Sequence, residues 1–64
     1  MQQAERAVRS EVARLDRAVC AELLGQVGIA VYDHEGVRVL RAAVVANVLD
    51  GTISRQRLRT TGKV

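Results

Sequence analysis

Cys20 and the run Asp33-His34-Glu35 carry the side chains of this sequence that are most often used in nucleophilic and metal sites. Adjacent residues of a strand or loop point in different directions, so the three consecutive side chains do not converge on one ion or substrate. The chain has one His and one Cys. We therefore predict a solvated turn at residues 33–36 and a small buried thiol at position 20. We expect no catalytic residue, metal site, cofactor or small-molecule substrate, and no enzyme activity.

A second chemical feature is the cationic C-terminal segment. Residues 51–64 contain four cations and no acid, whereas residues 1–50 hold six arginines against seven acids. The planar guanidinium group binds phosphates and carboxylates through several donors at once. This segment is therefore predicted to contact an acidic protein partner or nucleic acid, and residues 60–64 are predicted to form a basic tail. The four cations are Arg55, Arg57, Arg59 and Lys63.

The length of the chain limits the core that could position these groups. Its 64 residues allow a single small domain, and a domain of that size buries only roughly 60% of the surface of its unfolded chain. There is no Phe or Trp and only one Tyr. Because one Cys supports neither a disulfide framework nor a structural zinc site, we expect other copies of the chain or a larger complex to supply the missing burial.

The N-terminal part of the chain has the pattern of a long amphipathic helix, at about residues 2–24. It contains no Gly or Pro and is rich in residues that favour helices, until Gly25 ends the pattern. Such a helix is longer than the rest of so small a domain would cover, so we predict that its apolar stripe docks on a protein partner. The alternative is that the stripe covers the core of its own domain. The stripe consists of Val8, Val12, Leu15, Val19 and Leu23.

The remainder, residues 25–59, has the alternating period of β-strands. β-Branched residues crowd both sides of a short loop that ends in Gly36. Asp50-Gly51 is a favoured two-residue hairpin turn, and it would join two further strands. We therefore predict an α+β fold, in which one helix is followed by an antiparallel meander. The predicted strands are about 28–33, 37–49 and 52–59.

The alternative is an all-α helix-turn-helix protein, with the bend at Asp50-Gly51 and a DNA-reading helix within residues 52–63. The residues "SRQRL" with the following "GKV" resemble the second helix of excisionase-type DNA-binding proteins. This resemblance implies a small DNA-binding regulator. The helical interpretation would place four side chains at phosphates and base edges. They are Arg55, Gln56, Arg57 and Arg59.

For the α+β molecule we expect a non-enzymatic structural or assembly subunit, such as a minor structural protein of a bacteriophage particle. Its helix stripe would dock into a homo-oligomer or larger complex, and its arginines would contact acidic surfaces. No apolar run approaches the roughly 18 residues of a membrane-spanning helix. We therefore expect no membrane contact and a location in the cytoplasm or inside an intracellular or viral particle.

Overall fold

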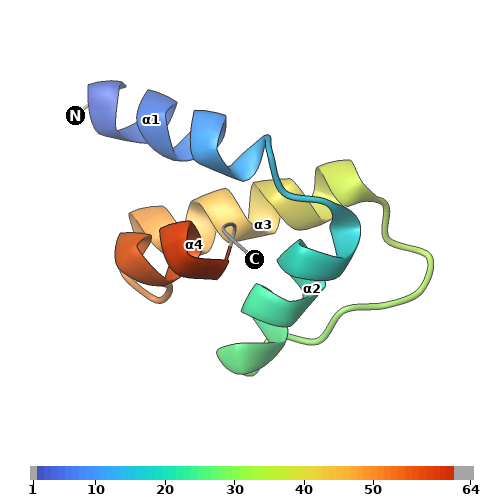
Figure 1. Ribbon diagram of the computed structural model, residues 1–64. Helices are drawn as coiled ribbons and strands as arrows, with labels where there is room; N and C mark the ends of the chain where they lie inside the picture. The colour runs from blue at the N-terminus through green and yellow to red at the C-terminus, as the bar shows by residue number, and fades with distance from the viewer. Residues whose placement is uncertain (1, 62–64) are drawn as a thin grey trace.

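The computed structural model describes residues 2–61 of the chain, and the surroundings of the side chains from residue 4 to residue 60. This part forms four helices and contains no β-strand (Figure 1). The α+β prediction is therefore wrong, and the all-α alternative fits the observed elements. The helices are α1 (Gln2–Val12), α2 (Arg17–Gln26), α3 (Val37–Leu49) and α4 (Arg55–Thr61).

The single helix predicted over residues 2–24 is two helices, because the chain turns between Val12 and Asp16. The Leu15 amide donates to the Val12 carbonyl oxygen at 2.9 Å and closes a short turn. Asp16 then caps α2, since its Oδ1 accepts a hydrogen bond from the Val19 amide at 3.0 Å. Aspartate is among the strongest residues at an N-cap and a weak one inside a helix, which explains the break at this position.

Replacing this cap gives the first testable prediction. Asp16→Ala is expected to lower the free energy of unfolding by about 1 kcal/mol, because the Val19 amide loses its acceptor. Urea denaturation followed by circular dichroism measures the change. Asp33→Ala, in the exposed part of the loop before α3, is the matched control and should unfold at the wild-type midpoint. Equal midpoints for both variants would show that Asp16 does not set the start of α2.

The predicted first strand, residues 28–33, lies in an irregular loop between α2 and α3. Gly28 has φ of 81° and follows the end of α2. Further along, the Glu35 amide donates to the Tyr32 carbonyl oxygen at 3.0 Å, and Asp33 and His34 are exposed. The predicted turn at 33–36 is thus confirmed, although no hairpin surrounds it. Arg17 of α2 holds this turn through two backbone carbonyl oxygens, at 2.9 and 3.0 Å.

The second predicted strand, residues 37–49, is α3. The prediction of a strand here is wrong because the alternating pattern also fits a helix. Leu40, Val44 and Val48 are spaced four residues apart, which places them on one helical face. Asp50 and Gly51 do make a turn, but Gly51 ends α3 with a φ of 89° instead of joining two strands. The pKa of the Asp50 carboxyl is lowered, mainly because it accepts a hydrogen bond from Thr52. The third predicted strand, residues 52–59, is a short connection followed by α4.

The core forms where α3 packs against both α1 and α2. The last helix, α4, also packs on α1 and α2. Four of the five residues of the predicted docking stripe, all but Val19, are at most 5% exposed. Val19 is partly buried against the same cluster. The stripe thus covers the core of its own chain. The buried cluster is Val8, Val12, Leu15, Cys20, Leu23, Leu24, Leu40, Val44, Val45, Val48, Ile53 and Leu58.

Candidate functional site

Within the described residues, the cationic segment is a short connection followed by α4, which is anchored by one apolar residue. Residues 62–64 of the predicted basic tail lie outside the described residues. Leu58 is 1% exposed, whereas Gln56, Arg57 and Thr60 face solvent. Ser54 precedes the helix, and its Oγ accepts a hydrogen bond from the Arg57 amide at 3.1 Å. This contact satisfies one of the free amides at the start of the helix. Except for Leu58, α4 therefore presents polar side chains along most of its surface.

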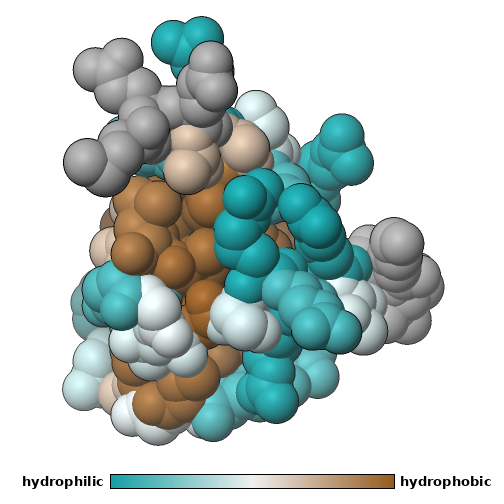
Figure 2. All heavy atoms as spheres, turned by 90° about the vertical axis from the view of Figure 1, so that its left-hand side faces the viewer, coloured by the Kyte–Doolittle hydropathy of each residue, from teal (hydrophilic) through white to brown (hydrophobic). Residues whose placement is uncertain are grey.

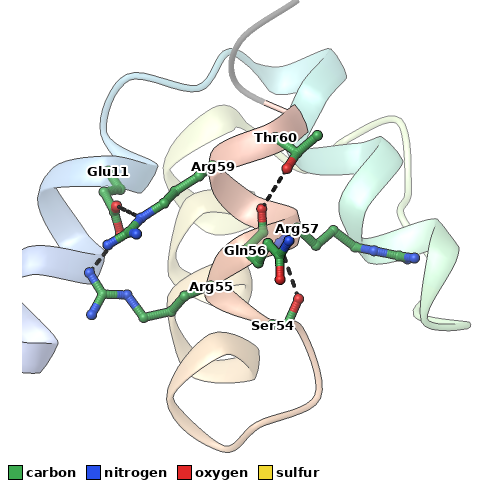
Figure 3. A network of polar contacts seen from close by, with 7 residues as sticks. All are labelled: Glu11, Ser54, Arg55, Gln56, Arg57, Arg59 and Thr60. Carbon is green, nitrogen blue, oxygen red and sulfur yellow. Dashed lines mark hydrogen bonds and ion pairs between the residues drawn. The ribbon is translucent and has the colours of Figure 1, made fainter.

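Two of the predicted contact residues, Arg55 and Arg59, bind a carboxylate of their own chain. Figure 3 shows both guanidinium groups converging on Glu11 of α1. The N to O distance is 3.0 Å in each of the two pairs. The hydrogen bond from Arg59 is the main cause that lowers the pKa of the Glu11 carboxyl. One carboxylate between two guanidinium groups leaves this cluster with a net positive charge.

Arg57 differs from its neighbours because its side chain extends toward the end of α2. Its Nη1 donates to the side-chain oxygen of Gln26 at 2.9 Å. A neutral amide orients the guanidinium group but does not neutralise it. Of Arg55, Arg57 and Arg59, Arg57 is therefore the one whose charge the described residues compensate least. Lys63, the fourth predicted contact, lies outside the described residues.

A shallow groove between α4 and the end of α2 has a volume of about 390 Å³. The described residues of its lining carry amide, hydroxyl and guanidinium groups and no carboxylate. Sequence reasoning missed Gln26 and Glu11, which precede their partners by 31 and at least 44 residues, and no local pattern marks either. The lining residues are Gln26, Ser54, Gln56, Arg57 and Thr60.

No known protein guides the assignment of this groove. The chain matches no protein-family model, no curated protein and no solved structure. The function is therefore argued from the geometry of the described residues alone.

The other residues singled out from the sequence occupy ordinary structural positions. Cys20 is fully buried, and burial raises the pKa of its thiol, which disfavours the reactive thiolate. The exposed His34 ring stacks on Tyr32 with 5.9 Å between ring centroids. Within residues 2–61 no three His, Cys, Asp or Glu side chains come together as metal ligands. None of the described helices has the length and apolar character needed to cross a membrane.

Proposed function

We propose that the protein binds duplex DNA through the outer face of α4. The observation that carries this proposal is the exposed face of α4, to which the described residues bring no carboxylate and on which Gln56 lies beside Arg57. Arginine and glutamine are the side chains that pair in bidentate fashion with guanine and adenine edges. DNA binding also agrees with the net charge of +3 for the whole chain.

The dimensions of α4 suit the major groove. A helix of seven residues is about 10 Å long, and the major groove is about 12 Å wide and admits one helix. The two arginines that bind Glu11 flank the proposed reading face. Their side chains remain 40% and 60% exposed, so their outer donors can reach phosphates while the carboxylate fixes their position. Phosphate contacts of this kind orient the protein, and base contacts specify the sequence.

The test is a titration of labelled random-sequence duplex DNA with the full chain at several salt concentrations. Binding should weaken steeply with salt, because each phosphate contact releases a counterion. Arg57→Ala is expected to lower the affinity about tenfold if the side chain contacts a base, or to reduce the salt slope by about one if it contacts a phosphate. Arg38→Ala, at an exposed arginine of α3, is the matched control and should change both quantities less.

Two outcomes would contradict the proposal. Absence of salt-dependent binding at low ionic strength would remove DNA as a ligand of this chain. Equal losses for the Arg57 and Arg38 variants would show that only the overall charge matters and that α4 has no special role. Circular dichroism of both variants establishes that they keep the wild-type helix content.

We propose as a second function a non-enzymatic assembly role, in which the chain docks on a protein partner. The predicted docking stripe covers the core, so this role needs another surface. Leu49, at the end of α3, is 46% exposed. Figure 2 shows hydrophobic atoms gathered on the side of the molecule where α1 begins and α3 ends. A minor structural role in a bacteriophage particle and a location in the cytoplasm or inside such a particle belong to this proposal.

A further inference from the structure

A second groove, between α1 and α3, combines arginines with an apolar floor. Its volume is about 290 Å³, and its lining is separate from that of the groove beside α4. Three arginines contributed by the two helices line it, together with Val12, Ala42 and Val45. They are Arg9, Arg38 and Arg41.

The arginines of this groove differ in how firmly they are held. Arg41 donates from Nε and Nη2 to the Leu15 carbonyl oxygen at 2.9 and 2.7 Å, which fixes its guanidinium group near the end of α1. Arg9 pairs with Glu5 through a 3.1 Å contact at the surface, where an ion pair is weak. Arg38 is exposed on the first turn of α3. The described lining of the groove is therefore positively charged, and Glu5 lies beside it, paired with Arg9.

The apolar floor continues along α3. Arg38, Ala42, Val45 and Leu49 are spaced by four, three and four residues, so they lie on one face of the helix. Leu49 is the most exposed leucine among the described residues, at 46%. The face thus begins with a cation at the start of α3 and ends with the exposed side chain of Leu49, about two helical turns beyond Ala42 in the groove.

From these features we propose that the groove binds an acidic amphipathic helix of a protein partner. Its apolar side chains would lie on Ala42, Val45 and Leu49, and its carboxylates would pair with the arginines. A second copy of this chain fits less well, because two identical grooves placed face to face would oppose arginine with arginine. Duplex DNA would satisfy the arginines but would leave Leu49 without an apolar contact. This inference rests on the assembly role proposed above and is independent of DNA binding.

The probe is a labelled synthetic helix of about 14 residues, with leucines at helical spacing on one face and glutamates beside them. Fluorescence anisotropy with the full chain should detect saturable binding. Arg38→Glu and Leu49→Ser should each weaken binding about tenfold, which corresponds to about 1.4 kcal/mol. Both positions are exposed, so the variants should fold, and circular dichroism checks this. Arg57→Ala is the matched control and should bind the probe with wild-type affinity.

Two further probes separate the contribution of the carboxylates to binding from that of the apolar side chains. Replacing every glutamate of the probe by glutamine, or every leucine by serine, should abolish binding in each case. Binding that survives loss of the leucines would overturn the proposal, because attraction between charges alone would then explain it. Displacement of the probe by duplex DNA in the wild type but not in the Arg38→Glu variant would assign the groove to DNA and overturn the proposal. Failure of the acidic probe to bind the wild type would also overturn it.

Co-purification of the tagged full chain from its native cells tests the assembly role separately. A protein partner that remains bound to the Arg38→Glu and Leu49→Ser variants would retain the assembly role and reject this groove as its site. A partner that is lost from both variants but kept by Arg57→Ala would support the assembly role and also the groove as its binding site.

Discussion

Leu23→Ala is expected to lower the free energy of unfolding by about 2 to 5 kcal/mol. Leu23 lies in α2 and is fully buried in the only hydrophobic cluster of the described residues. Removing its branched end leaves a cavity that the surrounding helices fill incompletely, so lost transfer energy and lost packing add together. A domain of this size has roughly 3 to 10 kcal/mol of total stability, at about 0.05 to 0.15 kcal/mol per residue. This one substitution therefore removes a large part of the total.

Thermal and urea denaturation of the variant measure this loss directly. Val39→Ala is the matched control on α3, because Val39 is 53% exposed and alanine favours helices more than valine does. The control should change the free energy of unfolding by less than about 0.5 kcal/mol. A Leu23 variant as stable as this control would mean that α2 does not pack on α3 as described.

The helical character of residues 2–12 and 17–24 could be predicted from the sequence, but the prediction of one continuous helix missed the break between α1 and α2. Val12, Leu15 and Val19 keep helical spacing across the break, so the apolar period runs on while the backbone turns. Leu15 points into the core from the turn and is 5% exposed. Asp16 was the available signal, because aspartate within a helical pattern favours the start of a new helix over an interior position.

The helix α3 was mistaken for a strand because its composition and spacing suit both. Valine prefers strands when local preference decides, but burial of Val44, Val45 and Val48 against two other helices outweighs that preference. As a strand, residues 40–48 would place their even-numbered residues on one apolar face, yet Ala42 and Ala46 of that face are exposed. Alanine at these two positions favours a helix, since it has the highest helix propensity and is depleted in strands.

The cationic site could be located from composition, but the roles of its arginines depend on the secondary structure. In a strand the odd-numbered Arg55, Arg57 and Arg59 share one face. In a helix, residues four apart share a face and the residue between them points elsewhere. The helix thus directs Arg55 and Arg59 to Glu11 and separates Arg57 from them.

Glu11→Gln is expected to loosen α4 from α1, with a loss of about 1 kcal/mol in the free energy of unfolding. Glu11 accepts from two arginines at 3.0 Å and its side chain is 25% exposed, while those of the arginines are 40% and 60% exposed. Solvent therefore screens part of the attraction. A neutral amide cannot balance both guanidinium groups, and Arg55 Nε is buried with no hydrogen-bond partner among the described residues. Hydrogen exchange should become faster in the amides of α4 and stay unchanged in α2.

The same carboxylate gives the stability a dependence on pH. Because Arg59 and Arg55 lower the pKa of Glu11 below its ordinary value of 4.5, the folded state releases this proton more readily than the unfolded state. The contribution of Glu11 is then complete above pH 4.5 and is lost as the pH falls below that value through the lowered pKa of the folded state. Denaturation of wild type and Glu11→Gln between neutral pH and this acidic range should give curves that differ above it and converge below it.

Glu5→Gln is the matched control, since Glu5 forms an exposed ion pair with Arg9 on the same helix. It should cost less than about 0.5 kcal/mol, the usual value for such a pair, and leave exchange in α4 unchanged. A double-mutant cycle of Glu11→Gln with Arg59→Gln isolates the interaction from other effects of each change. A coupling energy near zero would show that the contact does not hold α4, whereas a coupling of about 0.5 to 1 kcal/mol would show that a carboxylate of α1 positions the helix proposed to read DNA.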